Sequence, residues 1–326
     1  WHWLAFLFSL FGVLTVFGTG NATQVNTIVT AIDSLMLNFN LASSGSLSTI
    51  NLVIGIVIAI AVALILIGGI RRIGKVTETL VPFMALLYIL LGLGVVILNI
   101  QQIPAVFQSI FEGAFHPAAF TGGMVGTLFT SMKKGVSRGI FSNEAGLGSA
   151  PIAAAAAKTK EPVRQGLVSM TGTFIDTIII CTMTGLAIVM TGAWDMGLEG
   201  VAVTTKAFAL GLPFPAKVSA FILMMCLVFF AFTTILGWDY YSERCLEYLT
   251  NGHKTKIIVY KWLYILAVFI GPFMTVSAVW TIADICNGLM AFPNLVALLA
   301  LNGEVVSETR GYLERIGIMK TAVDEA

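Results

Sequence analysis

The sequence predicts an all-α polytopic membrane protein, and two observations indicate that class. Hydrophobic residues make up 57% of the 326 residues, charged residues make up only 11%, and the mean hydropathy is +0.92. Soluble domains carry about 25% charged residues. Apolar runs also recur along the whole chain at membrane-crossing length, since a hydrocarbon core about 30 Å thick requires roughly 20 apolar residues per helix. The net charge of +1 gives no reason to expect a nucleic-acid partner.

Eight spans are expected, bounded by polar residues or by glycine and proline. They cover residues 3–31, 50–70, 79–100, 124–158, 165–191, 217–247, 257–280 and 281–306. The final stretch contains Pro293, and its division into two short spans is the alternative, which would give nine. Residues 101–123, between the third and fourth spans, are expected to form an external loop with a short amphipathic helix.

Basic loops orient the spans. Three loops, after the second, fourth and sixth spans, are rich in lysine and arginine and fall on one side of the membrane. The positive-inside rule makes that side cytoplasmic. With eight spans, the C-terminal tail of residues 307–326 is then cytoplasmic too. Lys133, Lys134 and Arg138 are exceptions, because they lie at the outer entry of the fourth span.

The fourth span is interrupted between Gly135 and Thr159 by polar residues, glycines and a proline. Irregular backbone at membrane depth is tolerated only where protein or a water-filled cavity surrounds it. We therefore expect helix, unwound link and helix, with Ser142, Asn143 and Glu144 near the break. Free carbonyls there suit a cation, and free N–H groups suit a carboxylate. The alternative is a kinked helix in which Arg138 and Glu144 pair only for assembly.

Asp176 lies in the middle of the fifth span. A carboxylate at a helix centre costs about 2.5–3.5 kcal/mol, so it requires a partner in the protein or in water. Hydrogen bonding to a neighbouring helix and direct ligation of an ion are both open as its role.

Hydroxyl and amide groups mark two further spans. Thr233 and Thr234 are adjacent hydroxyls in the sixth span, and such oxygens suit sodium. The alternative is that both bond to carbonyls one turn earlier. Asn21 and Gln24 interrupt the first span, where amides suit a zwitterion or, alternatively, bonds between helices. The carboxylates after Thr234, at residues 239, 243 and 247, are expected to line an exit or to face solvent.

A membrane enzyme is the competing class, with Glu144, Asp176 or Asp239 as acid or base. The sequence offers no nucleotide motif, activated serine or lysine, or histidine and cysteine set at metal spacing. The four cysteines stand far apart and are expected to be small buried residues: Cys181, Cys226, Cys245 and Cys286.

Four blocks of sequence resemble the alanine or glycine:cation symporter family. They are RGIFSNEAGLGSAP, KTKEPVRQGLVSMTGTFIDT, FTTILGWDYYSERCLEYL and NGLMAFPNLVALL. The resemblance implies a LeuT-type core of two inverted five-helix repeats with alternating access. Residues 1–100 would be the remainder of the first repeat and residues 124–306 the second. The family's first two core helices have no counterpart, so we expect an N-terminally truncated chain with core helices three to ten, unable to transport by itself.

The same resemblance assigns roles to single residues. Phe141 and the backbone from Ser142 to Gly146 would line an amino-acid pocket that Trp238 closes, with Asn21 or Gln24 reaching in. The hydroxyls of residues 233 and 234 would belong to a sodium site, while Asn143, Glu144 and Asp176 keep no assigned role.

The implied activity is sodium-coupled symport of alanine or glycine across the cytoplasmic membrane, with a proton as the alternative coupling ion. No enzymatic reaction and no cofactor beyond the coupling ion are expected. The expected partners are the amino acid, the ion and the bilayer, and the protein is expected to act as a monomer.

Overall fold

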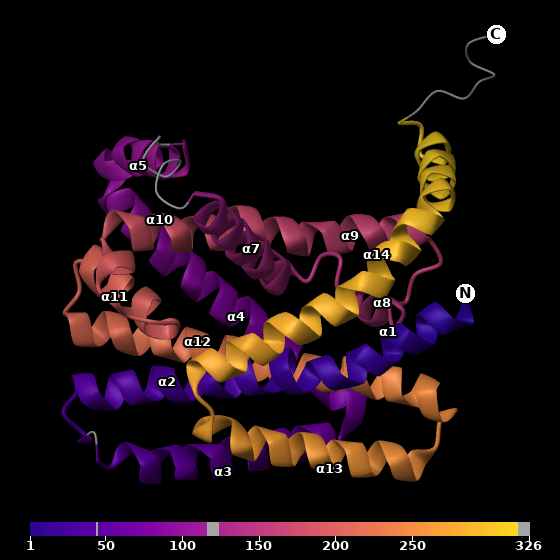
Figure 1. The fold of residues 1–326 in the computed structure, drawn as a ribbon, viewed down its shortest axis with the longest axis horizontal. Helices are drawn as coiled ribbons and strands as arrows, with labels where there is room; N and C mark the ends of the chain where they lie inside the picture. Colours follow the sequence, from indigo (N-terminus) through magenta and orange to yellow (C-terminus); the bar gives the residue numbers. More distant parts are fainter. Residues whose placement is uncertain (44, 116–123, 319–326) are drawn as a thin grey trace.

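The computed structural model describes residues 1–43, 45–115 and 124–318, and within them the regular structure is helical (Figure 1). The principal helices are α1 (His2–Thr15), α2 (Thr23–Asn38), α3 (Leu47–Leu66), α4 (Gly69–Leu98), α5 (Ile103–Phe115), α7 (Met124–Asn143), α8 (Ser149–Ala154), α9 (Pro162–Phe174), α10 (Thr182–Met190), α11 (Val201–Gly211), α12 (Ala216–Thr250), α13 (Lys254–Ile270) and α14 (Val276–Arg315). Two π-helical stretches join neighbouring helices: η1 (Val16–Ala22) between α1 and α2, and η3 (Ile175–Cys181) between α9 and α10.

Seven helical runs in the described part of the chain are long and apolar enough to cross a membrane. Each overlaps one of the eight expected spans, which confirms a multi-pass, all-helical membrane protein. The eighth expected span, residues 124–158, is instead α7 followed by the short helix α8. It is not among the seven because its two helices are separated by non-helical residues and because α7 carries three basic side chains.

The boundary expected between residues 280 and 281 is wrong by several residues. The chain breaks at η5 (Gly271–Phe273), because Pro272 has no N–H to continue the helix. Helix α14 then begins at Val276, where the Thr275 hydroxyl accepts a hydrogen bond from the Ala278 N–H. It continues to Arg315 with Pro293 inside it. The alternative of two short final spans is therefore not observed, and the first part of the expected tail at residues 307–326 is helical.

Helix α12 lies at the centre of the molecule. It packs against α1, α2, α4, α11 and α13 (Figure 1). Leu236, Trp238 and Tyr264 belong to one buried cluster that joins α12 to α13 and to the first two helices. Helix α12 therefore contacts both η1 and α2, the elements that carry the candidate residues Asn21 and Gln24.

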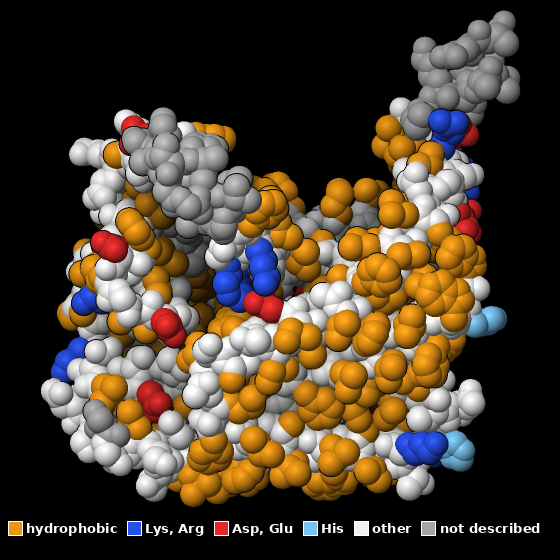
Figure 2. Space-filling view, in the orientation of Figure 1, with side chains coloured by type: hydrophobic (Ala, Val, Ile, Leu, Met, Phe, Trp, Pro, Cys, Tyr) orange, Lys and Arg blue, Asp and Glu red, His pale blue; other side chains and the backbone are white. Residues whose placement is uncertain are grey.

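Hydrophobic side chains cover most of the face shown in Figure 2, and Lys, Arg, Asp and Glu are confined to a few places on it. Exposed apolar residues are especially frequent on the run from Pro162 to Met190, only 11% of whose most apolar window is buried inside the structure. A surface of this kind is expected where lipid or further protein replaces water.

Candidate functional site

The interruption in the fourth expected span is an unwound link. Helix α7 ends at Asn143 and α8 begins at Ser149. Between them Glu144, Gly146 and Gly148 have positive φ angles of 56°, 87° and 89°. Glycine adopts such angles without steric cost, whereas a glutamate adopts them only when surrounding contacts hold it there. The sequence predicted this helix, link and helix arrangement, but it did not predict the strained position of Glu144.

Contacts from two elements hold Glu144. Its Oε1 accepts a hydrogen bond of 3.0 Å from the indole Nε1 of Trp238, and its Oε2 accepts one from the Ser149 hydroxyl. The link is thereby fastened both to the central helix α12 and to the start of α8. Trp238 reaches this position from a buried site on α12, and its expected role in closing an amino-acid pocket stays a prediction.

The last residues of α7 are bonded to the π-helix η3. The Ser142 hydroxyl donates to Asp176 Oδ2 at 2.7 Å, and Asn143 Nδ2 donates to the Thr177 hydroxyl at 2.9 Å. Asp176 therefore has a protein partner, as its position in a span required, and it joins two helices. Cys181 lies 3.3 Å from the Ser142 hydroxyl and is exposed, and Cys286 is only partly buried, so the expectation that the cysteines are buried holds for Cys226 and Cys245 alone.

Arg138 pairs with α14 and not with Glu144. Its Nη2 lies 3.0 Å from Asp284 Oδ2, and its guanidinium carbon lies 4.0 Å from the ring centroid of Trp280. Phe141 packs on the same tryptophan with 4.8 Å between ring centroids. The alternative in which Arg138 and Glu144 pair for assembly is therefore not observed.

A pocket of about 250 Å³ lies next to this cluster, where Trp280 lines it together with residues of α2 and α11.

The candidate residues of the first span do not reach the link in this conformation. Asn21 lies in η1, and its Nδ2 donates to the Tyr264 carbonyl of α13 at 3.0 Å. Gln24 Nε2 donates to the Thr19 carbonyl of its own helix at 3.1 Å. Gly20, directly before Asn21 in the chain, lets Trp238 approach so closely that a Cβ there would lie 2.1 Å from the tryptophan Cβ.

Thr233 and Thr234 both bond to backbone one turn earlier on α12. The Thr233 hydroxyl lies 2.9 Å from the Phe229 carbonyl, and the Thr234 hydroxyl donates to the Phe230 carbonyl at 2.8 Å. This is the arrangement named as the alternative to sodium ligation. A hydroxyl that donates keeps its lone pairs, so both oxygens still fit a cation, and the sodium site stays a prediction.

The profile of the sodium:alanine symporter family matches residues 1–325. The chain belongs to that family. The expected resemblance is confirmed, and the protein is a membrane transporter and not an enzyme. The match begins at residue 1 of this chain, and it does not test the expected N-terminal truncation.

Curated relatives in this family agree with the match. The chain is 49% identical to an uncharacterized transporter of Haemophilus influenzae, over 99% of this chain and 68% of the relative. It is 45% identical to the sodium/alanine symporter AgcS of Methanococcus maripaludis, over 95% of this chain and 65% of the relative. It is 34% identical to the amino-acid carrier protein AlsT of Bacillus subtilis, over 96% of this chain and 63% of the relative. The chain thus spans about two thirds of the length of the relatives that it matches.

Three residues of α14 next to the link were missed by the sequence analysis. Trp280 and Asp284 hold Arg138, and Asn294 Nδ2 donates to the Gly146 carbonyl at 2.9 Å. Asp284 could have been found, because the argument that a carboxylate within a span needs a partner applies to it as well as to Asp176. Asn294 stands inside the quoted block NGLMAFPNLVALL, but nothing in the sequence connects it with Gly146.

Proposed function

We propose that this symporter uses sodium to drive uptake of a small neutral amino acid, alanine or glycine, across the cytoplasmic membrane. The observation that carries the proposal is the unwound link at residues 144–148, which hydrogen bonds fasten to α8, α12 and α14. An interrupted helix frees backbone N–H and C=O groups from the helical pattern and offers them to a zwitterion or a cation. Both oxygens of Glu144 in the link accept hydrogen bonds, and Arg138 is paired with Asp284, which favours a neutral substrate.

The proposed mechanism is alternating access around this link. In a LeuT-type core of inverted repeats, sodium and substrate stabilise one closed conformation, and a rocking bundle then opens the other side. The pair Arg138–Asp284, with Trp280 against both Arg138 and Phe141, would form a barrier between the link and the pocket of about 250 Å³. The positive-inside rule would put this pocket on the outer side and the C-terminus in the cytoplasm.

The names of relatives support the substrate and the ion. The Methanococcus maripaludis relative is named a sodium/alanine symporter, whereas one from Bacillus subtilis is named a probable sodium/glutamine symporter. A relative from Bacillus sp. PS3 is named a sodium/proton-dependent alanine carrier protein, which keeps a proton as the second candidate for the coupling ion.

Uptake of radiolabelled alanine into liposomes containing the full-length protein tests the proposal. We expect an inward sodium gradient to drive accumulation, with excess unlabelled alanine or glycine competing and excess glutamate failing to compete. Accumulation driven by a proton gradient and indifferent to sodium would refute the sodium assignment. Absence of uptake for every small neutral amino acid would refute the proposed substrate class.

A further inference from the structure

Asp239 is a buried carboxylate without a hydrogen-bond partner. Its side chain is fully buried on α12, and neither carboxylate oxygen has a donor among the described residues. It lies eleven residues before the end of α12 at Thr250, about three helical turns. The sequence-based expectation of an exit lining or a solvated face is therefore wrong for Asp239. An ionised carboxylate in such surroundings is costly unless something neutralises it.

The donors close to Asp239 are all engaged elsewhere. The Ser242 hydroxyl donates to the backbone carbonyl of Asp239 at 2.9 Å. The Tyr260 hydroxyl donates to the Val13 carbonyl, and the Tyr264 hydroxyl donates to the Gly20 and Ile235 carbonyls. Tyr260 and Tyr264 are titratable groups of α13 that face Asp239, and both are committed as donors. These three hydroxyl groups therefore donate no hydrogen bond to the carboxyl group of Asp239.

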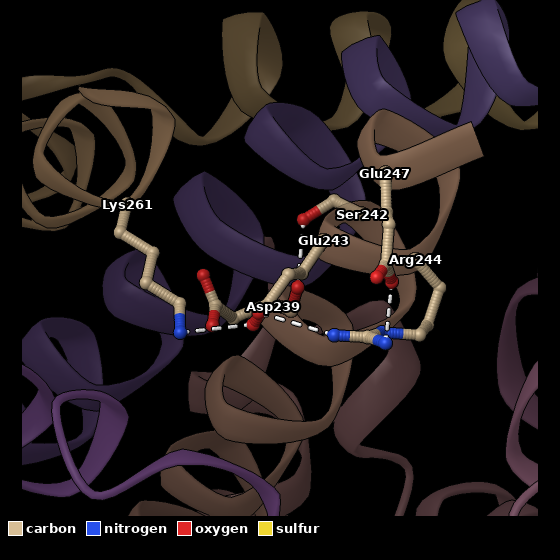
Figure 3. A network of polar contacts seen from close by, with 6 residues as sticks. All are labelled: Asp239, Ser242, Glu243, Arg244, Glu247 and Lys261. Atoms are coloured by element: carbon tan, nitrogen blue, oxygen red, sulfur yellow. Dashed lines mark hydrogen bonds and ion pairs between the residues drawn. The ribbon is translucent and has the colours of Figure 1, made fainter. Parts of the chain in front are cut away.

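The charges that act on Asp239 are Lys261 of α13 and Glu243 of its own helix. Lys261 Nζ binds Glu243 Oε2 at 2.9 Å, and Arg244 binds the other oxygen of Glu243 at 3.2 Å. Figure 3 shows Lys261 and Arg244 reaching Glu243 from opposite sides, with Asp239 beside them. Helix α1 and η1, which also pack here, carry no charged side chain after His2.

We propose that Asp239 is a proton-binding site, occupied in this conformation, and that its proton loss during transport moves Lys261 from Glu243 to Asp239. A proton fits better than a metal cation because the positive charge of Lys261 already acts on the carboxylate and, among the described residues, no hydroxyl or carboxylate oxygen is bonded to it. The proton leaves to water, and the ammonium of Lys261 then balances the new negative charge. Glu243 keeps Arg244 as its partner in both states.

The site is placed to affect transport. Asp239 follows Trp238, which holds Glu144 of the unwound link. Tyr264, on the other side, bonds to the carbonyl of Gly20, against which Trp238 packs. A shift of α13 that brought Lys261 to Asp239 would therefore act on the same contacts that fasten the link. This part of the inference rests on the proposed symport, whereas proton binding itself does not.

Infrared difference spectroscopy of the protein in liposomes, between acidic and alkaline buffer, tests proton binding without any transport. We expect a carboxylic-acid carbonyl band that Asp239→Asn removes and that the matched control Glu247→Gln keeps, since Glu247 is a half-exposed carboxylate on the same helix. Lys261→Gln should move the midpoint of this titration to higher pH by about one unit, because the nearby positive charge is lost. A band that survives Asp239→Asn, or a midpoint that Lys261→Gln leaves unchanged, would overturn the proposal.

Alanine uptake measured across the same pH range tests the link to transport. We expect the pH dependence of the unmodified protein to flatten in Asp239→Asn and to persist in Glu247→Gln. If the pH dependence of alanine uptake is unchanged in Asp239→Asn, the coupling of this proton to transport is overturned. A protein that shows the infrared band but transports no amino acid would refute the proposed symport and leave the proton site established. If Asp239→Asn does not fold, the titration of Lys261→Gln decides the question.

Discussion

Glu144 is held in a backbone conformation that a glutamate rarely adopts, and its two carboxylate oxygens serve two different elements. The φ angle of 56° places it in the left-handed region, and the bonds to Trp238 and Ser149 are what keep it there. Such a residue loses its support when either bond is removed. The energetic role of Glu144 is therefore testable by changing the side chain while leaving the backbone in place.

The variants Glu144→Gln and Glu144→Ala separate the hydrogen bonds from the charge. Alanine leaves the buried indole N–H of Trp238 without an acceptor, and we expect a loss of about 1–3 kcal/mol in the free energy of unfolding. Glutamine keeps an acceptor oxygen and should lose less. Thermal unfolding in detergent, followed by tryptophan fluorescence, measures both. Equal losses in the two variants would contradict the hydrogen-bond explanation.

Thr234→Ala tests the sodium site. We expect the sodium concentration for half-maximal alanine uptake to rise roughly tenfold, the effect of losing one modest ligand, with little change in protein abundance. Thr309→Ala is the matched control, because its hydroxyl also donates to the carbonyl four residues earlier and it is likewise partly buried, but it stands near the end of α14 and outside the proposed site. A parallel fall in uptake and abundance would instead indicate that Thr234 only stabilises its helix.

At the level of elements, the close approach of η1 to α12 depends on a glycine. A methyl group at Gly20 would overlap the Trp238 side chain, so η1 and α12 would have to separate. We expect Gly20→Ala to lower the free energy of unfolding by about 1–3 kcal/mol. Gly303→Ala on α14 is the control, since no atom lies within 4 Å of a Cβ there. Circular dichroism on heating compares them, and equal stability of the two variants would show that the contact is easily relieved.

The elements of this fold could largely be predicted from hydropathy, because a bilayer dictates the length and apolar character of each span. Seven expected spans correspond to the seven long apolar helical runs found in the described residues, and the glycine and proline pattern located the unwound link. The π-helical stretches could not be predicted, since they change the hydrogen-bond register without changing composition. For the same reason, Asn21 could be assigned to a polar interruption but not to its bond with α13.

Across the whole molecule, α7 and α14 are joined by the pair Arg138–Asp284, although 146 residues separate the two in sequence. Pairings at such distance have no local sequence signal, and for that reason the only partner considered for Arg138 was the nearby Glu144, in the alternative of a kinked helix. The sequence likewise did not connect Glu243 with its partner Lys261 on the next helix. Single positions were thus predictable from polarity, whereas the contacts between them required the packed structure.

A double-mutant cycle measures what this long-range pair contributes. Arg138→Ala, Asp284→Ala and the double variant should show a coupling of about 0.2–1 kcal/mol in the free energy of unfolding, because both side chains are partly exposed. If the pair belongs to a barrier, the single variants should also raise sodium-independent leakage of alanine from loaded liposomes. Additive effects in the cycle would show that the two side chains do not act together.

The π-helical stretches η1 and η3 determine how the helices that follow them respond to the insertion or deletion of a residue. A π-turn accommodates one residue more than an α-turn, so everything after it is rotated by roughly 100° relative to an uninterrupted α-helix. Asp176 and Asn21 each lie inside such a stretch. Deleting a single residue from η3 would therefore restore α-helical geometry and leave α10 on its present face, whereas deleting one residue within α10 would turn everything after it by roughly 100°. The π-helical stretches are thus the places where relatives of this chain could gain or lose a residue without redirecting the polar groups of the helix that follows.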